Sequence, residues 1–459
     1  MAIKKTLLSL VVLAFAFAMV GPAQAVGPER TQEWMAAQEG VEPQFAPGDT
    51  ITFENADVLR PFVPPSYQDI MIFDGMEVKI GETRDLSPAD VYKQATLQHQ
   101  AQVVLAEDGA LENFVAGRPF DTSKFVPEST QGENMDGYRA IWNFNFRWQG
   151  QGLSLKRFYG TWIRAGGEHD VTGQIEKGYE DMLLGGGTVP RILWGYYSRA
   201  YFNFRSDLPD QGYRMQGGWA DGTEYRELTS FDEPFDIRGT AFLIMRSTDP
   251  RKTDNSWAYI PNLRRVRRIS VEVKSDSLLG TDHTIEDFYG FAGRVLEHEW
   301  RFVGRTKILW IPTSVNPYAK FYGPNGWAQR DVWQLRDMLV IEQLPSFQPE
   351  HPYERKYIFI DENLGDCGFA ESYDRGDELW KVWQLSKIWT EDENFYAQHI
   401  GTPSQDHRGM RVAAFQSINV IDLQNDRGTL FPCQGHNHAP QKLSKLKKIL
   451  DVNYLSEGR

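Results

Sequence analysis

Several features that usually reveal the class of a protein are scarce in this chain. Its 459 residues include only two cysteines, too few for a disulfide-rich scaffold. After Val20, no apolar run approaches the ~20 residues that a membrane-spanning helix needs. The chain beyond that point is therefore expected to contain no transmembrane segment.

An excess of positive charge is also lacking. Lysine and arginine together number 49, against 62 aspartates and glutamates, and the net charge is −13. A nucleic-acid partner requires a basic face, so this balance argues against nucleic-acid binding. It also argues against loose adsorption to an anionic lipid surface.

Catalytic signatures are missing as well. Gly185-Gly186-Gly187 lacks the spacing and the Lys-Ser/Thr pair of a phosphate-binding loop, and His298-Glu299 lacks the second histidine of a zinc-protease helix. The nucleophile turn Gly-x-Ser-x-Gly does not occur. The acidic segment 282–287 matches no spacing that defines a metal site. We therefore expect no catalytic residues, no cofactor and no metal.

The first 25 residues have the pattern of a secretory signal peptide. Lys4 and Lys5 precede an apolar run from Leu7 to Val20, and Ala23-Gln24-Ala25 fits a small-x-small cleavage site. A transmembrane anchor is the alternative, but the run is short for one. We expect cleavage near Ala25 and an exported protein.

Export makes the two cysteines a candidate disulfide. An exported chain can oxidise Cys367 and Cys433, and their bridge would close a loop of about 66 residues, worth roughly 4 kcal/mol in the chain-entropy model. Two free thiols are the alternative, because a sequence cannot show that the two sites approach each other.

The aromatic content is high, and one stretch concentrates it. The chain has 14 Trp, 19 Tyr and 27 Phe, with 40 Gly and 24 Pro, a composition typical of turn-rich β proteins. Trp142, Phe144, Phe146 and Trp148 alternate with polar residues, which predicts a strand with four rings on one face. That face either packs on the core or forms the wall of an apolar ligand cavity.

Short apolar segments separated by turn signals continue along the chain. From residue 191 their spacing predicts one large antiparallel sheet rather than alternating strands and helices. We divide the chain into a signal peptide, 1–25; an N-terminal arm and β region that continues the same sheet, 26–190; a core, 191–390; and a C-terminal loop region with a short helix, 391–459.

The segment Asp254–Phe288 is the most informative stretch. Four arginines in five residues, Arg264, Arg265, Arg267 and Arg268, follow an aromatic strand. Strand alternation places Arg264 and Arg268 on one face, where they either pair with surface carboxylates or contact an anionic head group or partner. The acidic residues 282–287 are expected to pack against these neighbouring arginines.

The order of segments resembles a known family. The stretches SWAYIPNLRRVRRI, SLLGTDHTIEDF, RFVGRTKIL, YERKYIFIDENLG and DELWKVWQ resemble the outer-membrane lipoprotein-sorting proteins of the LolA/LolB-like superfamily. Over most of its length the chain is similar to the DUF1329 family, with LENFVAGRPF and IWNFNFRWQG fitting the N-terminal half of that family.

The resemblance implies a mainly β fold: a large, strongly curved antiparallel sheet, an incomplete barrel, with a few helices and loops over its concave face. Members of the superfamily hold acyl chains or other hydrophobic molecules there. The resemblance therefore implies a periplasmic, non-catalytic carrier or chaperone for a lipid or other hydrophobic cargo. Strand alternation and that concave face give the expected cavity lining: Trp142, Phe144, Phe146, Trp148, Trp194, Trp257 and Tyr259.

Partners are implied by the resemblance too. Genes of the DUF1329 family, which has no assigned activity, often lie beside those of an inner-membrane exporter and an outer-membrane protein. Two alternatives stay open: an envelope adaptor that docks such partners without binding lipid, and a hydrolase of envelope lipid or polysaccharide.

Overall fold

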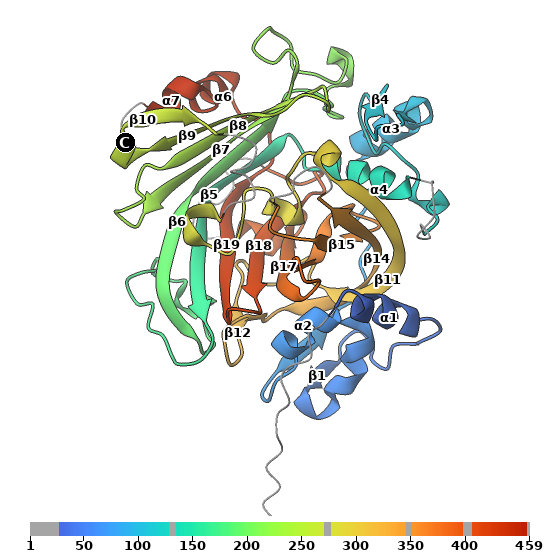
Figure 1. The fold of residues 1–459 in the computed structure, drawn as a ribbon, viewed down its shortest axis with the longest axis vertical. Coiled ribbons are helices and arrows are strands. Elements are labelled where there is room, and N and C mark those ends of the chain that lie inside the picture. The colour runs from blue at the N-terminus through green and yellow to red at the C-terminus, as the bar shows by residue number, and fades with distance from the viewer. Residues whose placement is uncertain (1–26, 128–134, 270–276, 346–350, 398–405, 457–459) are drawn as a thin grey trace, which may run out of the picture.

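One large sheet organises the molecule. The computed structural model describes residues 27–127, 135–269, 277–345, 351–397 and 406–456. Twelve strands follow one another in the order β14-β15-β16-β17-β18-β19-β5-β6-β7-β8-β9-β10, each antiparallel to its neighbours (Figure 1). Their bounds are β14 Val332–Leu344, β15 Arg355–Asp361, β16 Cys367–Tyr373, β17 Leu379–Trp389, β18 Ala413–Asp422, β19 Arg427–Asn437, β5 Gly152–Arg164, β6 Thr188–Tyr201, β7 Thr223–Glu233, β8 Ala241–Ser247, β9 Asn255–Ile260 and β10 Arg265–Arg268.

The sheet is extended at its β14 end. β11 pairs antiparallel with β14, and β2 pairs with β14 in parallel and with β1 antiparallel, so the sheet is mixed. The remaining strands form two small hairpins, β3 with β4 and β12 with β13. The bounds are β1 Thr50–Thr52, β2 Glu77–Ile80, β3 Val104–Leu105, β4 Leu111–Glu112, β11 Glu299–Trp310, β12 Phe321–Tyr322 and β13 Ala328–Gln329.

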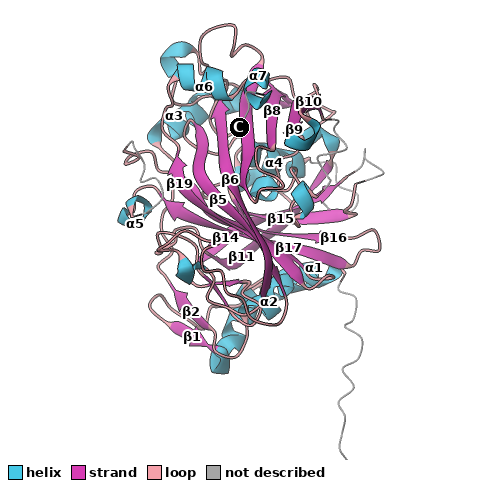
Figure 2. Ribbon diagram, turned by 90° about the vertical axis from the view of Figure 1, so that its left-hand side faces the viewer, coloured by secondary structure: helices cyan, strands magenta, loops and turns pink. Residues whose placement is uncertain are grey.

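Helices are short and lie at the periphery of the sheet. α6 and α7 cover β8–β10, α3 and α4 lie beside the opposite end of the sheet, and α1 and α2 lie near β1 (Figures 1 and 2). Their bounds are α1 Glu29–Ala37, α2 Pro65–Met71, α3 Asp90–His99, α4 Asp136–Asn145, α5 Glu393–Tyr396, α6 Leu443–Ile449 and α7 Val452–Ser456.

The sheet is strongly curved and is not closed into a barrel, as predicted (Figure 1). The antiparallel register shifts at several points, including between Phe302 and Gly304, between Trp194 and Gly195, and between Ser386 and Lys387. Such irregularities bend a strand and increase its twist, so they give the sheet its concave and convex faces.

The two faces carry two separate hydrophobic cores. Alternate residues of each strand go to opposite sides: in β15, Ile358 and Ile360 pack on the concave side, whereas Tyr357 and Phe359 pack on the convex side. The convex core includes buried apolar residues of the N-terminal region, within 51–80, and of the stretch 308–333 that joins β11 to β14. A third cluster joins α6 and α7 to β6–β9.

The predicted strand over Trp142–Trp148 is wrong. Residues 136–145 form α4, because Ala140, Ile141 and Phe144 recur at helical spacing and are all buried. Gly137 fits the same face: a Cβ there would lie 2.4 Å from the Trp300 carbonyl of β11. The alternation of four aromatic residues is too short to exclude a helix, because the helical spacing of Ala140, Ile141 and Phe144 overlaps the same stretch.

The predicted loop over much of residues 391–459 is also wrong, because β18 and β19 lie there in the middle of the sheet. Both strands carry buried polar side chains, such as Gln416 and Asn419 in β18 and Gln434 in β19, and β19 contains Pro432. The buried amides and hydroxyls bond one another, for example Asn419 Nδ2 to Gln384 Oε1 at 2.8 Å, so polar residues mask the strand pattern.

The candidate disulfide does not form. Cys367 and Cys433 are both buried free thiols. They lie on β16 and β19, three strand spacings apart, or roughly 14 Å, well beyond the reach of a disulfide. The predicted signal peptide, 1–25, lies outside the described residues. No helix of the described part of the chain is long and apolar enough to cross a membrane.

Candidate functional site in the concave face

The concave face is occupied by a segment of the chain itself. Residues 277–298, which we call the inner segment, run through three short 3₁₀ turns, at Leu278–Gly280, Phe288–Gly290 and Val295–Glu297, before entering β11. Figure 1 shows this yellow segment inside the curve of the sheet, in front of β17–β19. Its Tyr289 packs on Phe415 of β18, with ring centroids 4.6 Å apart.

Local chemistry explains how the inner segment folds back on itself. The Thr281 hydroxyl donates to the Leu278 carbonyl at 2.7 Å, and the Asp287 N–H donates to the Thr284 hydroxyl at 3.1 Å. Gly290 has φ +89°, and a Cβ there would lie 2.5 Å from Cys367 Sγ. The glycine therefore allows both the turn and the close approach to β16.

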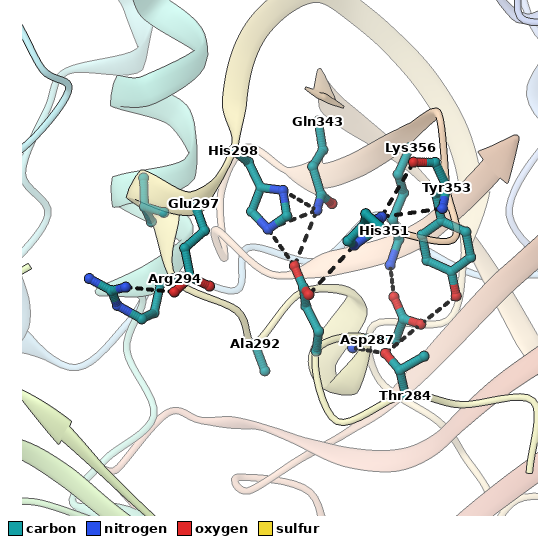
Figure 3. Close-up of polar contacts among 12 residues, drawn as sticks. Thr284, Asp287, Ala292, Arg294, Glu297, His298, Gln343, His351, Tyr353 and Lys356 are labelled. Carbon is teal, nitrogen blue, oxygen red and sulfur yellow. Dashed lines mark hydrogen bonds and ion pairs between the residues drawn. The ribbon is translucent and has the colours of Figure 1, made fainter. Parts of the chain in front are cut away.

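Two carboxylates bind the inner segment to cations of the sheet. Asp287 accepts from Lys356 Nζ on β15 at 2.6 Å and from the Tyr353 hydroxyl at 2.7 Å, and the Asp287 and Lys356 side chains are only 2% and 1% exposed (Figure 3). Burial alone would raise the pKa of Asp287, but the attraction of Lys356 and Lys381 and the hydrogen bonds outweigh it and hold that pKa below its usual value.

Asp282 makes the second set of contacts. It accepts from Arg427 Nε at 2.7 Å and from the Thr429 hydroxyl at 2.8 Å, both on β19. Lys381 Nζ of β17 donates to the Asp282 carbonyl at 2.9 Å. The inner segment thus contacts cations on three alternate strands, β15, β17 and β19.

Glu286 lies among two histidines. It forms an ion pair with His298, and its other oxygen lies 3.6 Å from His351 Nε2. Gln343 Nε2 donates to it at 3.4 Å. Figure 3 shows His298, His351 and Gln343 gathered on one side of this group. Burial would raise the pKa of Glu286, but the two histidines hold it well below its usual range. The pair with His298 lies within the inner segment, whereas the contacts of Glu286 with His351 and with Gln343 of β14 join the segment to the rest of the chain.

An apolar cavity of about 40 Å³ separates part of the inner segment from the sheet. Phe158, Tyr197, Phe242, Ile244 and Phe431 line it from the strands, and Leu278, His283, Thr284, Ile285 and Phe288 line it from the inner segment. A volume of this size holds a water or two, so a larger guest requires displacement of the inner segment.

His283 is the unusual member of that lining. His283 is 2% exposed, and its ring packs edge-on against Phe431 at 4.7 Å. Among the residues that the structure describes, neither ring nitrogen makes a well-formed hydrogen bond, although the Ile418 backbone lies close by. Buried side-chain polar atoms are nearly always hydrogen-bonded. Burial lowers the pKa of His283 to about 3, so the ring is neutral and offers one donor and one acceptor to a guest.

A buried polar group borders the cavity on the β6–β7 side. Glu227 accepts from the Tyr197 hydroxyl at 2.6 Å and from Arg199 Nε at 2.7 Å. The Tyr197 hydroxyl also lies 3.2 Å from that of Tyr289 in the inner segment. This arrangement ties the wall of the cavity to the segment that covers it.

The seven aromatic residues predicted to line the cavity lie elsewhere. Trp142 and Phe144 are buried in α4 at the end of the concave core, and Phe146 stacks on Trp142 with centroids 5.9 Å apart. Trp148 packs on Tyr92. Trp194 lies under Arg157, whose guanidinium is 4.0 Å from its ring, and Trp257 and Tyr259 pack with α6 and α7 on the outer face.

The arginines stand away from the acidic residues that were expected to pack on them. Arg264, Arg265, Arg267 and Arg268 are exposed at the β9–β10 hairpin, and Arg268 donates to Asn255 Oδ1 at 2.6 Å. Among the described residues, none of the four forms an ion pair with a carboxylate. The expectation for residues 282–287 is therefore wrong, because Arg427, Lys356 and the histidines take those carboxylates instead.

Sequence reasoning missed the residues that line the cavity. Phe242 and Ile244 alternate with Leu243 in β8, and Leu243 pairs with Trp257 across the sheet. Leu243 thus faces the outer helices α6 and α7. Its neighbours in the strand, Phe242 and Ile244, face the cavity. Only the strand register, which the sequence does not reveal, distinguishes the two faces.

A buried carboxyl of β7, that of Glu224, gives a pH prediction. Burial raises the pKa of Glu224 to about 7, against the opposing attraction of Arg246. The native state then holds this proton more tightly than the unfolded chain, so stability falls as pH rises from about 4.5 to 7. Glu224→Gln should match the wild type in urea unfolding near pH 4.5 and exceed it by about 2–3 kcal/mol at pH 8. A difference that does not vary with pH would contradict this.

Fold and site together define an open, curved β-sheet protein whose concave face is closed by its own chain over an apolar cavity. The chain belongs to the DUF1329 family, described as proteins of unknown function, whose model matches residues 50–448. This confirms the resemblance found in the sequence. None of the curated proteins compared with the chain matches it.

Solved structures similar to this one include the following three. The first, from Vibrio parahaemolyticus, is named as a proposed outer membrane lipoprotein-sorting protein domain; it is 16% identical, with 70% of this chain and 99% of that chain covered and a TM-score of 0.43. A DUF1329 family protein from Desulfovibrio piger is 16% identical, with 70% of this chain and 98% of that chain covered and a TM-score of 0.43. A LolA superfamily protein from Nitrosomonas europaea is 11% identical, with 66% of this chain and 92% of that chain covered and a TM-score of 0.34.

Proposed function

We propose that this protein is a non-catalytic carrier that holds the apolar part of a hydrophobic molecule between the inner segment and the concave face of the sheet. The observation that carries this proposal is the aromatic cavity beneath the inner segment, with the ring of His283 in its lining. A carrier requires a dry site, a cover that can move and a few polar groups.

The energetics suit such a role. Each methylene transferred from water into an apolar site gains ~0.8 kcal/mol, so a chain of ten or more carbons can offset the loss of several polar contacts of the inner segment. Those contacts hold the empty molecule closed and keep its aromatic lining away from water. In this proposal the described structure is the closed state, with the inner segment held against the sheet, and the guest enters as that segment moves away.

The setting of this carrier is part of the same proposal. An exported protein whose signal peptide is cleaved near Ala25 would work in the periplasm, between an inner-membrane exporter and an outer-membrane protein. Arg264 and Arg268 offer an exposed basic site for an acidic surface of such a partner. Charge reversal, Arg264→Glu with Arg268→Glu, should abolish co-purification of the partner from cross-linked cells, and unchanged co-purification would remove this role.

Filling the cavity tests the carrier proposal. Ile244→Trp places a larger ring in the space that a guest would enter, at a cost of about 1–3 kcal/mol in stability. We expect it to weaken binding of the neutral fluorescent probe N-phenyl-1-naphthylamine about tenfold, whereas Ile244→Val, the matched control, retains binding. Urea unfolding verifies that both variants are folded.

Native mass spectrometry of the purified wild type complements this measurement by showing whether a lipid co-purifies. If the wild type neither binds the probe nor carries a lipid, the carrier proposal is wrong. The structure then fits an envelope adaptor whose sheet docks partners and encloses nothing.

A further inference from the structure

The charges in the concave face are divided between two parts of the chain. Asp282 and Asp287 come from the inner segment, and their cationic partners, Lys356, Lys381 and Arg427, come from strands of the sheet. Side chains of Lys356 and Lys381 are almost fully buried. A buried cation is costly unless an anion compensates it, so whatever replaces the inner segment must replace its negative charge.

The two lysines lie among aromatic rings. Lys356 Nζ is 4.0 Å from the centroid of Trp383, and Lys381 Nζ is 4.5 Å from that of Trp380. Once the inner segment is displaced, these cations would stand on a face that is otherwise apolar. An ammonium group framed by rings at the end of an apolar surface fits the junction between an acyl chain and an anionic head.

One residue of the inner segment links the apolar cavity to the carboxylate that binds Lys356. Thr284 lines the cavity, and its hydroxyl donates to Asp287 Oδ2 at 2.9 Å, the carboxylate that binds Lys356. His283 lies next to it in the chain and lines the same cavity, and neither of its ring nitrogens makes a well-formed hydrogen bond within the described part of the chain. A guest whose tail fills the cavity would therefore carry its head toward the positions of the Asp282 and Asp287 carboxylates.

We infer, resting on the proposed carrier function, that the cargo is an anionic amphiphile, and that Asp282 and Asp287 occupy the positions of its head group in the closed molecule. Lys356, Lys381 and Arg427 bind the carboxylate or phosphate of the cargo after the inner segment leaves. Loading is then an exchange of one anion for another, and the two buried lysines, Lys356 and Lys381, are never left without a partner.

Displacement of N-phenyl-1-naphthylamine from the full chain tests this inference with three probes of equal chain length. Dodecanoate and dodecyl phosphate should displace the dye at concentrations about tenfold or more below 1-dodecanol, because a hydrogen bond to a charged group is worth that much or more. The better of the two anions identifies the head group as a carboxylate or a phosphate.

Variants locate the preference. Lys356→Met should remove the advantage of the anions over the alcohol, and Lys356→Arg should restore part of it. Lys387→Met is the matched control, since Lys387 is a buried lysine of β17 that pairs with Asp366, outside the inner segment, at 2.7 Å. Asp287→Asn should tighten binding of the anions more than that of the alcohol, because the internal competitor loses its charge.

The outcomes separate the two proposals. Equal displacement by anions and alcohol, or an anion preference that Lys356→Met leaves intact, overturns the anionic-head inference while the carrier function stands. Absence of dye binding overturns both. If Lys356→Met does not fold, the comparison of Asp287→Asn with the wild type decides, and an unchanged ratio of anion to alcohol affinity contradicts the inference.

Discussion

Replacing Asp287 with alanine is expected to lower the free energy of unfolding by about 3–5 kcal/mol, the usual cost of removing one partner of a buried ion pair. The substitution leaves Lys356, 1% exposed at its side chain, without its carboxylate in a dry face of the sheet. It also removes the acceptor of the Tyr353 and Thr284 hydroxyls. Urea unfolding, followed by tryptophan fluorescence, measures the loss.

Asp57→Ala provides the matched control on the surface. Asp57 pairs with Arg60 at 3.0 Å, but the two side chains are 94% and 46% exposed, so solvent already screens their attraction. Such pairs contribute about 0–1 kcal/mol. If Asp287→Ala loses no more stability than Asp57→Ala, then the carboxylates of the inner segment do not hold it in the concave face.

The fold class could be predicted because its signal is repeated along the chain. Alternating apolar segments, such as those that became β6, β15 and β17, each report locally on a strand. Their short spacing indicates antiparallel neighbours, and the segment order carried the resemblance to the family. Where two periodicities overlapped, as in Ala140–Phe146, local pattern alone could not choose between strand and helix.

The site was beyond the reach of the same reasoning because its contacts join distant parts of the chain. Asp282 contacts Arg427 and Thr429, which come after β11 to β18 in the sequence. Asp287 contacts Lys356, which is also distant in the chain. Nothing in the local sequence distinguishes Arg427 from the four arginines of the β9–β10 hairpin, which lie closer in the chain. The prediction paired the acidic residues with their sequence neighbours, whereas burial of the inner segment selected partners on the sheet.

A carrier of this design requires the inner segment to leave the concave face before a guest can enter. A disulfide between the inner segment and β19 would prevent this movement. The pair Asp282→Cys with Thr429→Cys suits the purpose, because these side chains are in direct contact, with the Thr429 hydroxyl 2.8 Å from Asp282 Oδ2. The native thiols do not interfere: burial raises the pKa of both Cys367 and Cys433 to about 12, which keeps them protonated and unreactive at neutral pH.

Binding of N-phenyl-1-naphthylamine to this double variant, oxidised and then reduced, is the most direct test. The comparison uses one protein in two redox states, so the loss of the Asp282 contacts is the same in both. If the open state is required, oxidation lowers its population and weakens the apparent affinity by about tenfold or more, and reduction restores it. Equal affinity in the two states, with the disulfide verified by mass spectrometry, would show that a guest binds without displacement of the inner segment.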